Sequence, residues 1–342
     1  MPRNPKHILP VFLALLLSSC GTIHDSLENC GFYLQFVYDY NMEYTDSFTA
    51  QVSCVDVFVF DEADTLVSRR HIQTSELIDG NKMYMNEGML PGNDYKILTI
   101  GGFSEYFRLT DIQGNELIPG KSVLAEVELA LKREGGEASH LFSPLWFARQ
   151  IVTAGYPAYK QVIPVPLVKN TNRFNIVLYR RDYSGPQEKP TAEDGGPLYT
   201  FEIVTPEGAV YGYDNSPLTQ DTVTYKPHTL RLGTTDDSYS VGNLKTVRLL
   251  DTRKTRASGE SGYRLIVRNR STDGEEWNVD LIDILNELNS DLYGIWQLQE
   301  FLDRKSVWDI AILHTGGNND GAFLAVAIQI GPWIKWFHDM PL

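Results

Sequence analysis

Apolar and polar residues alternate along much of this chain, and the alternation predicts β-strands. In the segments 32–38, 173–179 and 263–268 an apolar residue recurs at every second position, which would place one face of each strand against a core. The run Val-Asp-Val-Phe-Val-Phe at 55–60 predicts the second strand of the chain. Further strand patterns lie at 95–100, 123–131, 161–168, 199–204, 229–232, 246–250, 307–313 and 322–330.

Helical spacing of apolar residues is much less common. It occurs at 277–288 and at 293–302, and short helices are also expected near 74–78 and 143–149. The 27 glycines and 17 prolines suit many short strands joined by turns. We therefore expect a mainly β protein, with two β-sandwiches in tandem and short helical insertions.

One segment interrupts the strand patterns and marks the expected domain boundary. Residues 181–197 lack apolar periodicity and contain three prolines, which is typical of a linker. The predicted organisation is a first sandwich over 20–180, a linker over 181–197 and a second sandwich over 198–342.

The N-terminus reads as an export signal. Arg3 and Lys6 precede an apolar run at 8–17, which is too short to span a bilayer, and the run ends in Leu-Ser-Ser-Cys at 17–20. These four residues resemble a lipobox, so residues 1–19 would be removed and Cys20 would carry the lipid. An ordinary secretory signal is the alternative, and either one takes the chain out of the cytosol.

The charge composition excludes one class of partner for the exported chain. Lys and Arg number 30 against 44 Asp and Glu, giving a formal net charge of −14 at pH 7. Such a chain repels nucleic acid, so we expect no nucleic-acid partner. In an oxidising compartment the remaining cysteines, Cys30 and Cys54, are candidates for a disulfide; two buried free thiols are the alternative.

No catalytic or metal-binding motif stands out. The seven histidines are scattered without the spacing of metal ligands, which predicts no metal site, and no motif calls for a cofactor. We therefore expect no enzymatic activity. The alternative is a pair of carboxylates that hydrolyses glycosides. Trp333 and Trp336 are candidates for seating a partner strand or stacking on a sugar, with core packing as the alternative.

Several motifs, in this order, resemble the fimbrial anchor lipoproteins of Bacteroidetes, and the resemblance covers nearly all of the mature chain. They are Leu-Ser-Ser-Cys at 17–20, Glu-Asn-Cys-Gly at 28–31, Phe-Val-Tyr-Asp-Tyr-Asn-Met at 36–42, Asp-Ser-Phe at 46–48, Val-Phe-Val-Phe-Asp at 57–61, Leu-Pro-Gly-Asn-Asp-Tyr at 90–95, Val-Asp-Leu-Ile-Asp-Ile-Leu at 279–285, Glu-Phe-Leu-Asp-Arg at 300–304 and Ile-Gln-Ile-Gly-Pro-Trp at 328–333.

The resemblance implies two tandem transthyretin-like sandwiches held in the outer membrane by the lipid on Cys20. It further implies a protein that holds the base of a fimbria, limits the length of the filament and takes fimbrial subunits as partners. Open sandwich edges suit docking by β-strand exchange, with the segment 322–330 or 332–342 as the docking element. A surface lipoprotein that binds glycans and a secreted hydrolase are the rival hypotheses.

Overall fold

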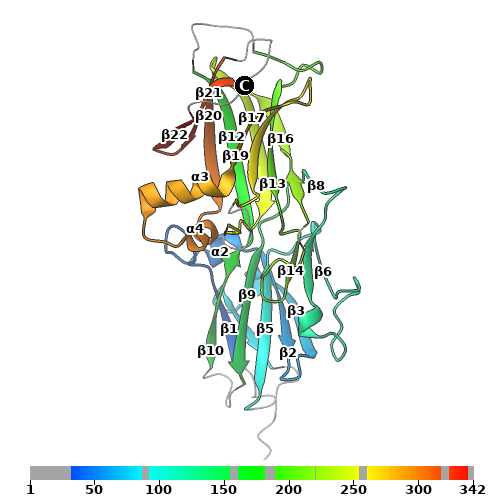
Figure 1. Cartoon of the computed structure of the whole chain (residues 1–342). Helices are drawn as coiled ribbons and strands as arrows, with labels where there is room; N and C mark the ends of the chain where they lie inside the picture. The colour runs from blue at the N-terminus through cyan, green and yellow to red at the C-terminus, as the bar shows by residue number, and fades with distance from the viewer. Residues whose placement is uncertain are drawn as a thin grey trace, which may run out of the picture.

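The computed structural model describes residues 32–86, 92–154, 161–181, 189–219, 221–253, 260–316 and 323–337. Figure 1 shows two β-rich halves stacked end to end, with the few helices gathered on one side near the middle. The predicted mainly β class, with few helices, is confirmed. None of the described helices is long and apolar enough to cross a membrane.

The lower half of Figure 1 is a sandwich of two sheets with a third, smaller sheet on one side. The first sheet has the order β10-β1-β4, formed by Val162–Pro166, Phe32–Val37 and Lys82–Met85. The second has the order β11-β9-β5-β2-β3, formed by Val168–Lys169, Trp146–Thr153, Asp94–Gly101, Cys54–Phe60 and Leu66–Gln73. The third has the order β14-β7-β6, formed by Val210–Gly212, Glu128–Leu131 and Phe107–Thr110.

Strand β2 is buried on both faces because it lies in the middle layer. Val55, Val57 and Val59 pack into the core shared with β1, where they meet Phe32, Leu34 and Phe36. Phe58 and Phe60 point the other way, into the core shared with the third sheet. Burying each such side chain contributes roughly 1.5–3 kcal/mol, which explains why an almost unbroken apolar run forms this strand.

The upper half is a second sandwich. One sheet has the order β16-β17-β12-β20-β21-β22, formed by Thr229–Leu232, Ser238–Val247, Thr171–Arg180, Val307–Gly316, Phe323–Ile330 and Trp333–Phe337. The other has the order β19-β18-β13-β15-β8, formed by Glu275–Asp280, Arg264–Asn269, Tyr199–Thr205, Val223–Tyr225 and Glu137–Ala138. The alternating residues Phe174, Ile176 and Leu178 are fully buried between them.

The two halves exchange strands at their junction. Strand β8, from the first half of the chain, pairs with β15 in the upper sandwich, and β14, from the second half, pairs with β7 below. One hydrophobic core runs from the third lower sheet into the upper sandwich. The halves are therefore interlocked and do not hang on a flexible tether.

The structure moves the expected domain boundary. Strand β12 lies in the upper six-stranded sheet, where it pairs with β17 and β20, so residues 171–180 do not belong to the first sandwich. Residues 181–197 consequently join two strands of the same sandwich, β12 and β13, and the chain passes between the halves near Asn170, between β11 and β12. The turn-rich composition of 181–197 indicates a break between two strands, but composition does not tell which sheets those strands join.

The helices are shorter than their sequence patterns suggest. Within the predicted segment 277–288, β19 continues to Asp280, whose side chain accepts a hydrogen bond from the Asp283 backbone N–H and starts α3 at Leu281–Leu288. A π-helical turn, Asn289–Tyr293, ends at Gly294 with a left-handed φ of 61°, and α4 follows at Leu298–Arg304. Part of the helix predicted at 143–149 is instead the start of β9, because pairing with β5 and β11 overrides the local preference.

Further short helical segments complete the described elements: α2 at Phe48–Gln51 and 3₁₀ turns at Thr74–Glu76 and Leu124–Glu126.

Candidate functional site

The outer face of the six-stranded sheet carries a groove of about 800 Å³, which we call the outer groove. Its floor is apolar and comes from the residues of β12 and β20 that alternate with the core positions. Val177 is in register with Ala311, and Tyr179 is in register with Leu313. The parallel pairing of these two strands therefore lays a continuous apolar strip across the open face.

The walls of the outer groove are polar. Asn175 donates a hydrogen bond to Asp309 at 2.5 Å across the two strands, and the Arg180 backbone N–H bonds the Asp237 carbonyl at 2.8 Å. Gln329 of β21 and Arg181, just beyond β12, complete the walls. An apolar floor with hydrogen-bonding walls suits an extended polypeptide, whose side chains alternate and whose backbone carries donors and acceptors.

Strand β22 lies next to β21 at the end of the same sheet, and its inner face is used in packing. Trp333 is 8 % exposed, and its Nε1 donates a hydrogen bond to Asp291 at 2.8 Å. Lys335 pairs with Glu287 of α3 at 2.5 Å, and the ring of Phe337 lies edge-on to that of Trp277, with centroids 5.5 Å apart. These contacts clamp β22 against α3 and the turn that follows it.

The opposite face of β22 is open. Ile334 is 44 % exposed, and Trp336 is half-buried, with the Arg181 guanidinium 4.1 Å from its ring centroid. Gln329 and Ala327 of β21 are in register with Ile334 and Trp336, so these two residues extend the outer face of the sheet. Among the described strands, β22 ends the sheet and has a paired neighbour on one side only.

The two tryptophans singled out in the sequence thus lie on opposite faces of one strand. A spacing of three residues reverses the face in a strand, where the period is two. Trp333 serves the core, which was the alternative considered for both residues, and Trp336 lies on the open face beside the outer groove. The positions alone did not reveal this difference, because the period of β22 follows only from its pairing with β21.

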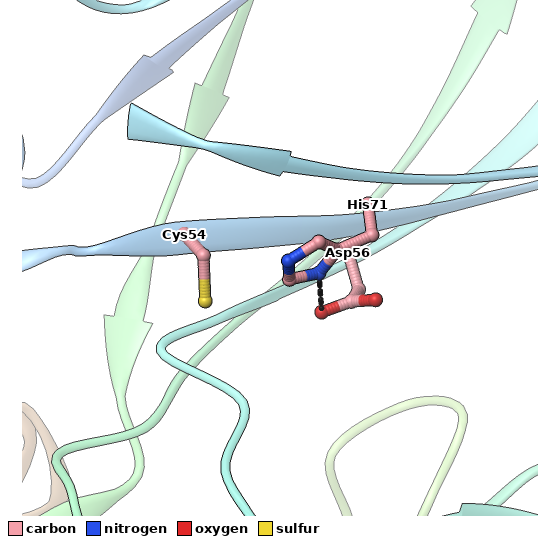
Figure 2. A group of neighbouring side chains, drawn as sticks. All are labelled: Cys54, Asp56 and His71. Carbon is pink, nitrogen blue, oxygen red and sulfur yellow. Dashed lines mark hydrogen bonds and ion pairs between the residues drawn. The ribbon is translucent and has the colours of Figure 1, made fainter. Parts of the chain in front are cut away.

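A second cluster lies on the lower half, shown in Figure 2. Cys54 and Asp56 of β2 and His71 of β3 hold a sulfur, a carboxylate oxygen and a ring nitrogen within 4.8 Å of one another. The Asp56 carboxylate is 3.1 Å from His71 Nδ1. Burial raises the pKa of the Cys54 thiol, and Asp56 acts in the same direction, so the thiol is held protonated in the protein as described.

The cluster bears on the predicted disulfide between Cys30 and Cys54. Cys30 and the predicted lipidation residue Cys20 lie outside the described residues, so both predictions stay predictions. Cys54 is a buried free thiol on the face of β2 that carries Asp56 and Phe58, and β1 packs on the other face.

The sequence did not predict this cluster, because its residues follow neither a helical nor a closely spaced metal-binding motif. The signal present was a Cys-x-Asp in one predicted strand and a His-x-Gln soon after it. Only the antiparallel register of β2 and β3 makes these residues neighbours.

The fold defines an all-β protein of two interlocked sandwiches with an open groove on the outer face of one sheet. Solved structures share this architecture. A candidate adhesin from Bacteroides ovatus is 37 % identical with a TM-score of 0.79, covering 94 % of this chain and 99 % of that one. A protein from Bacteroides thetaiotaomicron described as polysaccharide-binding is 25 % identical with a TM-score of 0.73, covering 91 % and 99 %.

The fimbrial anchor protein Mfa2 from Porphyromonas gingivalis shares the fold at 19 % identity, with a TM-score of 0.65 over 89 % of this chain and 98 % of that one. A search of curated proteins finds no significant match. The profile of the fimbrillin-A associated anchor proteins Mfa1 and Mfa2 matches residues 27–339, and the chain belongs to this family. The predicted family is thereby confirmed, and membership implies association with fimbrial subunits.

Proposed function

We propose that this protein is a lipid-anchored outer-membrane lipoprotein that holds the base of a fimbria. In this proposal the lipid on Cys20 retains the chain at the cell surface, and the upper sandwich docks a fimbrial subunit by strand exchange. The protein would act as a structural component and not as an enzyme. The support comes from family membership together with the placement of the two ends of the molecule.

The observation that supports the proposal is that the start of the described chain and the outer groove lie in different halves of the molecule. Val37, at the end of β1, lies at the junction of the halves, because its carbonyl accepts a hydrogen bond from the Leu167 backbone N–H just before the chain crosses upward. Strand β1 runs from Phe32 to Val37, so its start points away from the junction, into the lower half of Figure 1. Cys20 precedes Phe32 by twelve residues, whereas the outer groove and β22 lie in the other half.

Such an arrangement suits an anchor, with the membrane attachment at one end and the filament at the other. An extended strand of a fimbrial subunit would pair with the open edge of β22. Its outward side chains would continue the apolar surface of Ile334 and Trp336 beside the groove. A subunit seated on a membrane-held edge is fixed at the base, and this capping would limit filament length.

The docking proposal is tested by binding purified fimbrial subunit to the immobilised protein. Ile334→Lys places a charge on the proposed interface, so we expect at least a tenfold weaker affinity, equivalent to about 1.4 kcal/mol. Ile295→Lys is the matched control, because Ile295 is 75 % exposed on a different surface. Equal affinity of the two variants would exclude the β22 edge as the docking site.

Glycan binding in the outer groove is the second candidate, favoured by the description of the Bacteroides thetaiotaomicron relative. Against it, Arg181 covers one face of Trp336, and a sugar needs a free aromatic face to stack on. Saturable binding of a polysaccharide that is lost in Trp336→Ala, with no binding of fimbrial subunit, would favour the glycan function.

A further inference from the structure

The antiparallel pairing of β2 and β3 gathers four polar side chains on one face of the middle sheet. Asp56 is directly opposite His71, and Cys54 is directly opposite Gln73. Directly opposed residues of an antiparallel pair have Cβ atoms about 5 Å apart, so the four form a compact rectangle. Figure 2 shows Cys54, Asp56 and His71 on the same side of the ribbon.

The rectangle contains a buried carboxylate, that of Asp56, with few hydrogen-bond partners to offset the loss of its hydration. The Asp56 side chain is 5 % exposed, and among the described residues its one hydrogen-bond partner is His71, which is itself half exposed. A carboxylate can accept about four hydrogen bonds, and a buried one ordinarily has charged or multiple partners. Arg69, the next residue along this face of β3, is engaged with Glu116 at 2.7 Å.

We propose that Cys54, Asp56 and His71 form a zinc site. Thiolate, imidazole and carboxylate are the ligands that Zn²⁺ takes in proteins, whereas Mg²⁺ and Ca²⁺ prefer oxygen ligands alone. The three ligand atoms lie within 4.8 Å of one another, and tetrahedral zinc holds its ligands about 3–4 Å apart. Modest side-chain rotations bring them into range. The half-exposed His71 leaves room for a water as fourth ligand.

Gln73 supplies the outer support that such sites need. Its amide nitrogen is 3.1 Å from His71 Nε2. With His71 Nδ1 on the metal, Nε2 carries the ring proton and donates a hydrogen bond. The Gln73 amide accepts this bond once it has turned so that its oxygen faces the ring. Binding replaces the Cys54 S–H bond with a Zn–S bond, and the proton passes to the solvent. The metal would cross-link β3, which ends its sheet, to the buried strand β2.

Cobalt(II) is the probe, because a thiolate ligand gives it a charge-transfer band that oxygen and nitrogen ligands do not. The full chain, without a histidine tag and under reducing conditions, is titrated with Co²⁺, followed by displacement with Zn²⁺. We expect one Co²⁺ per chain with the thiolate band, and loss of this band in Cys54→Ser. Cys30→Ser is the matched control and should keep the band.

His71→Gln and His140→Gln form the second pair, since both side chains are exposed and a glutamine at position 71 can still donate a hydrogen bond to Asp56. His71→Gln should abolish the thiolate band and His140→Gln should retain it. Gln73→Ala should weaken the affinity about tenfold. The proposal is overturned if saturating Co²⁺ gives no thiolate band, or if the band survives in His71→Gln.

Discussion

Residues at the junction of the two halves hold a buried ion pair. Arg248, just after β17, donates from Nε and Nη2 to the two carboxylate oxygens of Asp303 in α4, each at 2.7 Å. Arg248 also reaches the Asn215 carbonyl at 3.3 Å, beyond β14. Burial alone would lower the pKa of Arg248, but the hydrogen bonds and charge of Asp303 raise it above its ordinary value. Arg248 is therefore charged at any physiological pH.

Replacing Asp303 with Asn should destabilise the protein by about 3–5 kcal/mol, because the change leaves a buried guanidinium without its counter-charge. The measurement is the free energy of unfolding from urea denaturation. Asp273→Asn is the control: Asp273 is 93 % exposed beside Arg268, and Asn tolerates its φ of 55°, so the change should stay within about 0.5 kcal/mol. Similar effects of both changes would contradict a structural role for the pair.

A second residue at the junction is a lysine in an unfavourable environment. Burial lowers the pKa of Lys169 to about 8, and the charges of Lys245 and Arg173 act in the same direction, while Glu43 acts against it. The ammonium lies over the Trp146 ring and donates to Gln51 at 3.2 Å. The unfolded chain binds this proton up to about pH 10.5, so between the two pKa values the unfolded state carries more protons than the folded one.

Stability should therefore rise with pH above about pH 8, and Lys169→Met should make that rise smaller. Burial also lowers the pKa of Lys245 and of Lys305, so these two residues keep their part of the rise in the variant. The variant should also be more stable than the parent at about pH 7, by roughly 1–3 kcal/mol. The free energy of unfolding of the two proteins is compared from about pH 7 to about pH 9.5. At higher pH the ionisation of Tyr38 in the unfolded chain would lower stability, because burial raises the pKa of Tyr38 to about 12 in the folded protein. If the free energies of unfolding of the two proteins changed in parallel with pH, the pKa of Lys169 would not be lowered in the folded protein.

At the scale of elements, β22 shows how pairing gives similar residues different roles. We expect Trp333→Ala to cost about 3–5 kcal/mol, since it empties a core position and breaks the hydrogen bond to Asp291. Trp336→Ala should cost about 1 kcal/mol, mainly the contact with Arg181. The measurement is thermal unfolding of the two variants in parallel. Equal losses would mean that the two faces of β22 are not distinguished as described.

The sequence predicts some strands well and others not. The strands at 32–38, 55–60 and 263–268 were found because their apolar periods are strong and local. The start of β9 was missed because it depends on partners distant in sequence, and β12 was assigned to the wrong sandwich for the same reason. The Cys54 cluster was missed because it depends on the register of two strands.

The whole molecule should unfold as one unit. Strands β8 and β14 each pair with the opposite half, and one hydrophobic core runs through both halves. Neither half is therefore complete without the other. We expect a single cooperative transition, with coincident curves from tryptophan fluorescence and far-ultraviolet circular dichroism. Two resolved transitions would contradict the interlocked junction.

In the proposed function, a lipid on Cys20 at one end of the molecule holds a filament that is bound at the other end. The most direct test replaces Cys20 with Ala in the native bacterium and measures fimbrial subunit on cells against subunit shed into the medium. We expect filaments that still assemble but are shed, because docking is intact and retention is lost. An unchanged cell-bound fraction would contradict the proposal.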